Sequence, residues 1–267
     1  MPRAPTAVLL VTASCLLSAC ASAPTRSGFL TSYEAMKPVE DAVRAKVNTH
    51  RTPEALKAVT RVTIAPTQIL PTAHGGWMNE AERQALLREI DAQLCFELSE
   101  RYEIVSAEDL EAARVRAAIT NVTPTGRVGS AAAAAASFFI PGPIGVRAPG
   151  TTGSLAAEAE MLAPRTGKQI AAVSWNRAAT PIGTDDPSLS RIGDALQFAE
   201  PFADTVGEVM EPDDAKKREF SSDEDPCKAY GARFRPEGWA AKFATGLYVP
   251  QLSGASREKA EEEPASK

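Results

Sequence analysis

The sequence is poor in the residues on which most enzyme chemistry depends. Its 267 residues include only two histidines, His50 and His74, so a zinc site or a histidine-based triad has little to draw on. It contains no GxSxG nucleophile elbow, phosphate-binding loop or dinucleotide fingerprint. We therefore expect no metal and no cofactor. His74 follows an expected strand and precedes an expected helix, where active-site loops occur, so a catalytic role stays open beside that of an exposed turn residue.

Basic clusters and long hydrophobic runs are scarce too. Lysine and arginine number 29 against 34 aspartates and glutamates, which gives a formal charge of −5. An acidic chain without a basic block argues against nucleic acid as a partner and against electrostatic adhesion to anionic lipid. Beyond the N-terminal run, no segment has the quality of a membrane span. Most of the chain should be a soluble body.

The segment from Val128 to Val146 carries no charge and is the nearest to a span. Its alanines contribute little transfer energy, and Pro-Gly-Pro at 141–143 would leave backbone groups unsatisfied in lipid. We expect a short alanine-rich helix and loop packed over a sheet. The alternative is a flexible insertion in which Phe138, Phe139 and Ile140 touch lipid or a partner.

The N-terminus has the features of a signal peptide. Arg3 supplies a positive start, and the apolar run from Ala7 to Leu17 is too short to span a bilayer. The ending Leu17-Ser18-Ala19-Cys20 resembles the lipobox of bacterial lipoproteins. That resemblance implies that Cys20 takes a diacylglyceryl group, becomes the first residue after cleavage and contacts membrane lipid through its acyl chains, such as palmitate. Ordinary secretory cleavage near Ala19 or Ala21 is the alternative.

Cleavage before Cys20 removes Arg3 as the only charged residue, so the formal charge of −5 becomes −6. Two or three acyl chains anchor a protein lastingly, whereas one does not. Roughly eight residues of flexible tether reach about 15 Å on average, so the body should sit close to the membrane. Ala21 stands where an aspartate retains lipoproteins in the inner membrane of enteric bacteria, which favours the outer membrane and a periplasm-facing body.

Four cysteines are present, and two of them are accounted for at the N-terminus. Cys15 leaves with the signal peptide and Cys20 is acylated, which leaves Cys95 and Cys227. In an oxidising compartment two such thiols tend to pair. We expect a disulfide, with two unpaired cysteines and a buried helical Cys95 as the alternative.

Hydrophobic periodicity predicts the main elements. Residues 58–70 form the first core element. Apolar and polar residues alternate over 61–65 like a strand, and Pro66 should end the paired part. Asn79 and Glu82 then form a capping pair before a helix of about six turns, whose apolar side carries Leu86, Leu87, Ile90, Leu94 and Leu98. Residues 102–105 should form a short strand.

A second group of elements follows. Residues 113–120 and 155–162 alternate like strands, and a turn at 164–167 leads to a strand at 170–175. Within residues 155–162, Glu158 and Glu160 share one face. We interpret them as part of a solvated sheet face, with an acid pair as the alternative. A last helix, capped by Ser188 or Ser190 and kinked or divided at Pro201, should run to Met210.

This order, β-α-β-β-β-β-α, predicts an α+β domain in which an antiparallel sheet of four to five strands carries two amphipathic helices on one face. We divide the chain into five parts: the signal peptide 1–19, the lipid-anchored tether and N-terminal arm 20–56, the α+β domain 57–210, an irregular extension 211–250 and a disordered tail 251–267.

Two segments outside the domain carry apolar anchors. Gly28 to Pro38 contains Phe29, Leu30 and Tyr33, and we expect it to lie on the domain as an ordered arm rather than a loose linker. In the extension, Arg233 and Arg235 flank Phe234. They belong either to a surface loop or to a contact with a partner or lipid head groups.

Three features of the sequence carry a resemblance to a known family. These are the stretch Ser27-Gly28-Phe29-Leu30 through Lys37-Pro38, the hairpin from Gly167 to Val173 that follows a small-residue insertion, and the lipobox ahead of both. In these features the sequence resembles the bacterial lipoprotein family DUF3313. The resemblance covers roughly Gly28 to Met210. It implies a periplasm-facing lipoprotein with no assigned activity and supplies no catalytic residues.

The absence of site chemistry and the short tether favour a non-enzymatic, membrane-anchored binding or accessory protein of the cell envelope, with an envelope protein as partner. The order of elements is also similar to that of small accessory lipoproteins that support envelope assembly, which is an analogy of fold alone. Two alternatives remain. One is a hydrolase acting on envelope material through His74, and the other is a carrier of a small ligand or lipid.

Overall fold

A computed structural model describes residues 26–40, 42, 44–127, 129–130, 145–147, 151–180, 182–183, 185–221 and 224–255. Three expectations fall outside this range. They concern the signal peptide with Cys20, the alanine-rich helix or insertion with Phe138, Phe139 and Ile140, and the part of the predicted tail 251–267 that lies beyond residue 255.

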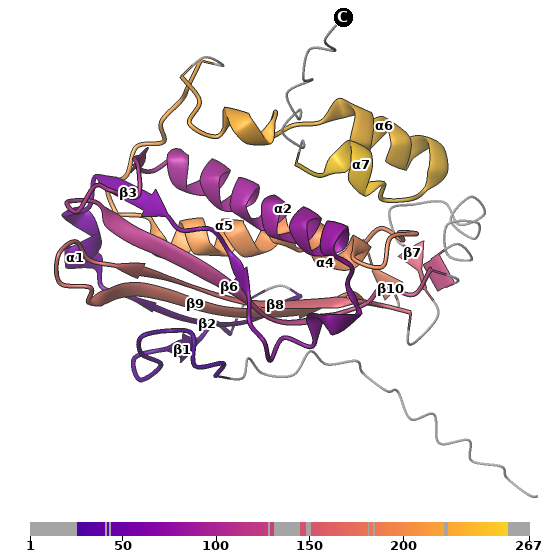
Figure 1. The fold of residues 1–267 in the computed structure, drawn as a ribbon, viewed down its shortest axis with the longest axis horizontal. Helices are drawn as coiled ribbons and strands as arrows, with labels where there is room; N and C mark the ends of the chain where they lie inside the picture. Colours follow the sequence, from indigo (N-terminus) through magenta and orange to yellow (C-terminus); the bar gives the residue numbers. More distant parts are fainter. Residues whose placement is uncertain are drawn as a thin grey trace, which may run out of the picture.

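An eight-stranded mixed sheet forms the centre of the molecule (Figure 1). Its strands follow the order β1-β2-β9-β8-β6-β3-β5, and β4 also pairs with β6. Their bounds are β1 Lys37–Pro38, β2 Lys46–Arg51, β3 Arg61–Ile64, β4 Gln68–Ile69, β5 Glu103–Ile104, β6 Ala113–Thr123, β8 Ser154–Leu162 and β9 Gln169–Ala178. Two further short strands, β7 Gly145–Val146 and β10 Ile182–Gly183, form a separate antiparallel pair.

The α+β class is therefore confirmed. The prediction of four to five antiparallel strands is wrong in detail, because the sheet has eight strands and only some of them pair antiparallel. Strands β2, β9, β8 and β6 pair antiparallel, but β3 runs parallel to both β5 and β6. A helix crosses between β3 and β5, and such a crossover returns the chain in the same direction. Strand β2 escaped prediction because Val47 is its one aliphatic residue, so its sequence shows no alternation.

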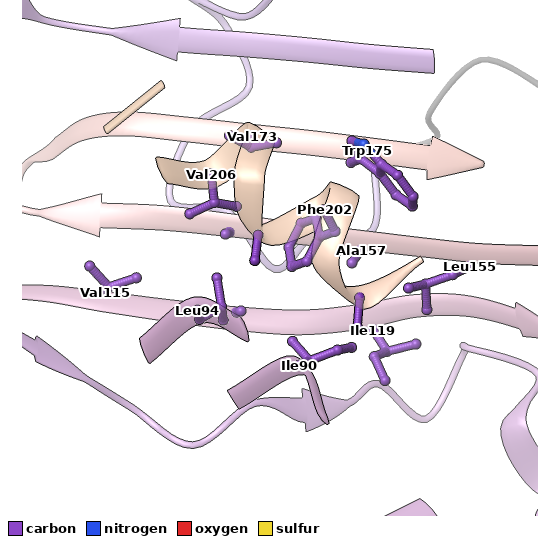
Figure 2. Close-up of a cluster of buried hydrophobic side chains, with 14 of the residues drawn as sticks. Ile90, Leu94, Val115, Ile119, Leu155, Ala157, Val173, Trp175, Phe202 and Val206 are labelled. Atoms are coloured by element: carbon purple, nitrogen blue, oxygen red, sulfur yellow. The ribbon is translucent and has the colours of Figure 1, made fainter. Parts of the chain in front are cut away.

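Helix α2, Glu80–Ser99, has the expected capping box. The Asn79 side chain accepts from the Glu82 amide at 2.8 Å, and the Glu82 carboxylate accepts from the Asn79 amide at 2.9 Å. Ile90 and Leu94 are fully buried. Figure 2 shows Leu94 and Ile90 in one cluster with Val115 and Ile119, so α2 packs its apolar face on the sheet as predicted.

The last predicted helix is divided into α4, Gly193–Gln197, and α5, Ala199–Met210. The break falls at Phe198, and Pro201 lies in the first turn of α5, where a missing amide hydrogen costs no helical bond. The prediction that Ser188 or Ser190 caps this helix is wrong. The Ser188 hydroxyl donates to the Tyr248 carbonyl and accepts from the Ser190 amide instead.

The molecule is layered (Figure 1). Helices α2 and α5 cover one face of the sheet, and the arm that leads into β1 lies on the other face. The C-terminal extension, with η2 Lys228–Tyr230, α6 Pro236–Thr245 and α7 Pro250–Ser253, lies on the outer side of α2. Two short elements, α1 Pro53–Lys57 and η1 Gly75–Trp77, connect the first strands. Within the described residues no helix is long and apolar enough to cross a bilayer.

The extension is fastened to α2 by a disulfide. Cys95 of α2 pairs with Cys227, with their Cα atoms 5.8 Å apart. Phe96 and Ala92 pack around the bridge. Beside it, the Arg88 guanidinium lies 5.1 Å from the centre of the Tyr230 ring. The two cysteines left over in the sequence are thus joined, and the bond holds a segment that has little apolar core of its own.

We predict that replacing both cysteines, Cys95→Ala with Cys227→Ala, releases the extension but leaves the domain folded. Tyr248 is the one extension residue that packs against the main core of the described chain. A bridge between residues 132 apart contributes on the order of 4 kcal/mol to the attached state in the chain-entropy model. Because the attached state loses this contribution, limited proteolysis at residues 211–221 should accelerate by about tenfold or more. The circular dichroism spectrum should stay nearly unchanged. Global unfolding of the variant contradicts the prediction.

Candidate functional site

Two carboxylates of β8 lie buried on the sheet face that is turned away from the helices. Glu158 and Glu160 are 1% and 0% exposed, so the expectation of a solvated face is wrong for them. The reason is the N-terminal arm, which covers this face and supplies hydrogen-bond donors to both carboxylates. A buried carboxylate is stable only when its oxygens find such donors.

Glu158 is held mainly by hydroxyl groups. Ser27 and Tyr33 of the arm donate to its Oε2 at 2.5 and 2.7 Å, and Ser174 of β9 donates to Oε1 at 3.3 Å. The Tyr33 hydroxyl also accepts from the Gly28 amide at 3.0 Å. The hydroxyl oxygen of Tyr33 therefore makes hydrogen bonds both within the arm and to the sheet.

Glu160 joins the arm to a cation. The Thr31 amide and hydroxyl donate to its two oxygens at 2.8 and 2.9 Å. Gln169 Nε2 donates at 2.6 Å, and Arg116 Nε donates at 2.6 Å. All of these donors lie on β6, β9 or the arm, so the charge of Glu160 is matched where three parts of the chain meet.

Apolar contacts complete the attachment. Phe29 and Leu30, both less than a tenth exposed, pack on Ala118 and Ala172, whose small side chains leave room for them. Arg116 lies 4.7 Å from the Phe29 ring centre and donates to the Phe29 carbonyl at 2.9 Å. The arm therefore lies on the domain in an ordered form, as the sequence analysis expects. We call Ser27, Thr31, Tyr33, Glu158 and Glu160 the carboxylate latch.

A second buried polar cluster lies at the two ends of the charge-free segment. Arg147 and Asp194 form an ion pair at 2.7 Å, with side chains 1% and 0% exposed. Arg147 also donates to the Ser130 hydroxyl at 3.3 Å, and the Gly153 amide donates to Asp194 at 2.6 Å. The cluster thus joins Ser130, near the start of the segment, to Arg147, directly after it, and to Asp194 of α4. Sequence reasoning missed it, although Arg147 is the first charge after the run.

Between α2 and α5, acidic groups crowd together. Asp204 of α5 is half-buried beside Glu97 and Glu200, and loss of hydration with repulsion from both carboxylates raises the pKa of Asp204 to about 7. Arg101 binds Glu97 at 2.9 Å, and Arg233 of the extension pairs with the same carboxylate. We therefore expect the contact between α2 and α5 to depend on pH.

The outer side of α2 and the extension enclose a groove of about 1180 Å³. Ala81, Ala85 and Glu89 of α2 line one side, and Arg235 and Leu252 line the other. Arg235 is therefore drawn into a cleft, whereas its neighbour Phe234 stays 72% exposed at the edge. We call this space the extension groove.

The histidines do not assemble a catalytic site in the described part of the chain. His74 is exposed, adopts a left-handed backbone with φ 52°, and caps no backbone amide of η1. His50 lies on β2, where burial and the nearby Lys168 lower its pKa. Among the described residues, no three His, Cys, Asp or Glu side chains gather as metal ligands.

The fold and the latch define an α+β domain strapped by its own N-terminal arm. The chain belongs to the family described as "Protein of unknown function (DUF3313)", whose model matches residues 25–206. The match therefore includes the latch and ends before the C-terminal extension.

Other comparisons are distant. No curated protein matches the chain. Among solved structures, the PelC dodecamer from Paraburkholderia phytofirmans in space group P6 is similar at 10% identity, covering 62% of this chain and 97% of that one, with a TM-score of 0.38. A variant of that dodecamer in space group C2 matches at 10% identity, covering 63% and 99%, with a TM-score of 0.37.

We predict that Tyr33→Phe loosens the arm, because Glu158 loses a donor and the Gly28 amide loses its acceptor. Such a lost buried hydrogen bond costs about 1–2 kcal/mol. Hydrogen exchange over residues 27–36 should accelerate by about tenfold for each 1.4 kcal/mol of that loss. Glu34→Gln, at an exposed position of the same arm, is the matched control. Equal exchange in the two variants contradicts the latch.

We also predict that Asp204→Asn flattens the pH dependence of stability. A carboxyl whose pKa rises to about 7 in the folded protein stabilises it fully below the unfolded pKa, near 3.8, and this contribution is lost as the pH rises through 7. The variant should exceed the wild type at pH 8 by on the order of 1 kcal/mol, allowing for solvent screening. Urea unfolding between pH 4 and 8 measures this, with the exposed Glu208→Gln as control. Parallel profiles of Asp204→Asn and wild type contradict it.

Proposed function

We propose that this protein is a lipid-anchored, periplasm-facing binding protein of the bacterial cell envelope, without enzymatic activity, held in the outer membrane by acylated Cys20. One observation carries the proposal. The described part of the arm starts at Arg26, six residues after Cys20, and its Ser27, Thr31 and Tyr33 are bound to buried carboxylates of the sheet. The attachment is therefore firm almost up to the anchor.

The short distance has a geometric consequence. Six residues span at most about 20 Å even when fully extended. With Cys20 acylated, the arm face of the sheet lies near the bilayer, and the helices and extension lie on the opposite face (Figure 1). A flexible linker would leave the orientation free, whereas the latch limits it.

Binding is favoured over catalysis by how the ionisable groups are used. The latch carboxylates accept hydrogen bonds from the arm, and Asp194 is paired with Arg147. The extension groove lies between α2 and the extension, and the extension lies on the side of the molecule away from the arm (Figure 1). That placement suits a protein partner in the periplasm.

The anchor is tested by Cys20→Ala. We expect the wild type to incorporate labelled palmitate and to remain in the outer-membrane fraction, and the variant to do neither, because a polypeptide without acyl chains has no comparable hold on lipid. Cys15→Ala, inside the proposed signal peptide, is the matched control and should behave like the wild type. Equal membrane retention of the Cys20→Ala variant contradicts the proposal.

The binding role is tested in intact cells. A photo-reactive amino acid placed at Gln84, on the groove side of α2, should crosslink to an envelope protein. The same probe at Glu34, on the arm face, should instead crosslink mainly to lipid. The reverse pattern contradicts the proposed orientation.

A further inference from the structure

The extension groove contains an arginine whose hydrogen-bond donors are incompletely satisfied. The Arg235 side chain is 11% exposed, and its ion-pair partner Glu89 lies 3.9 Å away. Its Nη1 donates to the Ser253 carbonyl at 2.6 Å, and its Nη2 reaches the Tyr230 carbonyl at a long 3.4 Å. Its buried Nε has no hydrogen-bond partner among the described residues.

This arrangement leaves one edge of the guanidinium without a full set of hydrogen-bond acceptors. A carboxylate binds arginine through two parallel hydrogen bonds to adjacent nitrogens. On Arg235 the pair Nε and Nη2 offers such an edge, because one has no partner and the other has a weak one. An unpaired buried donor costs free energy, so a ligand carboxylate that satisfies it binds more tightly.

The acidic residues of the groove do not fill this role. Glu89 already accepts from Gln93 at 2.7 Å and from the Ala255 amide. Glu82 is bound by Arg191 at 2.5 and 3.0 Å. Both carboxylates are thus hydrogen-bonded elsewhere, and neither they nor Glu237 of the lining accepts a hydrogen bond from Nε of Arg235.

The rest of the groove fits a short peptide better than a small ion. Its volume of about 1180 Å³ lies just above the usual range for small-molecule pockets. Its lining alternates apolar side chains such as Ile192, Leu196 and Leu252 with the polar Gln84 and Gln251. Such a surface can pack apolar side chains and bind a peptide backbone.

We propose that the extension groove binds an acidic peptide segment of an envelope protein, with a glutamate or aspartate carboxylate on Nε and Nη2 of Arg235. The proposal rests on the binding function proposed above and names the chemistry of its partner. The groove exists because the disulfide holds the extension on α2, and the extension lies outside residues 25–206 that the family model matches. Recognition of this ligand is therefore a property of this chain's own extension.

The test uses the full chain without its signal peptide, immobilised with its disulfide intact, and two libraries of blocked pentapeptides. One library has glutamate at the centre and Leu, Ala, Phe or Ser elsewhere, and the other has glutamine at the centre. We expect the glutamate library to be retained at least tenfold more, because a carboxylate accepts two charge-assisted hydrogen bonds from arginine and a neutral glutamine side chain does not. Equal retention of both libraries overturns the proposal.

The residue is tested by Arg235→Gln, which should lower retention of the best glutamate peptide at least tenfold and remove the preference for glutamate. Arg235→Lys keeps the charge but lacks the planar guanidinium, so it should also lose most of the preference for glutamate. Lys242→Gln, which breaks a 2.8 Å ion pair of α6 with Asp186 outside the groove lining, is the matched control. Unchanged binding by Arg235→Gln overturns the proposal.

The comparison of glutamate with glutamine peptides on the wild type does not depend on the folding of any variant. Vesicles of phosphatidylglycerol serve as a competitor. Displacement of the glutamate peptide by vesicles at a lipid concentration equal to that of the peptide overturns the proposal in favour of a lipid site. Peptide binding needs no acylation. If no glutamate preference is found but Cys20 proves to be acylated in cells, the groove proposal fails while the proposed anchoring stands.

Discussion

The burial of two carboxylates on β8 is the constraint on which the arm face of the structure depends. Glu158 and Glu160 stand two residues apart and so lie on the same side of the strand. A charge withdrawn from water needs donors around it, and most of these donors belong to the arm, about 130 residues away in sequence. The arm and the sheet must therefore fold together. Without the arm, this face would be an open polar surface.

The two faces of the sheet are stabilised by different means. On the helix face, α2 and α5 bury a continuous apolar core around Trp175, Phe198 and Phe202, whose rings meet edge to face. On the arm face, and where Arg147 and the extension join the domain, small apolar clusters are combined with ion pairs, hydrogen bonds and one disulfide. These segments contain too little apolar surface to hold by packing alone, so each is tied at a few specific points.

The sequence predicted what is local. The capping box, the apolar face of α2, the hairpin and the pool of two cysteines could all be identified from neighbouring residues. Strand β2 could not, because its pairing with β9 is set by a partner far along the chain. Glu158 and Glu160 were misjudged for the same reason. Alternation identifies which residues share a face, but it does not show what covers that face. Arg235 is among the residues identified from the sequence, but the missing hydrogen-bond partner of its Nε depends on how the extension folds.

The latch and the extension groove lie on opposite faces of the domain and are held by separate ties (Figure 1). A pull on the N-terminus acts on Tyr33, Thr31 and the two glutamates, whereas the groove depends on the Cys95–Cys227 bridge to α2. Sites that share no residues and lie apart contribute to stability nearly additively. The family match includes the first site and ends before the second. The attachment of the arm and the extension groove are therefore physically separable, and a substitution in the extension need not disturb the latch.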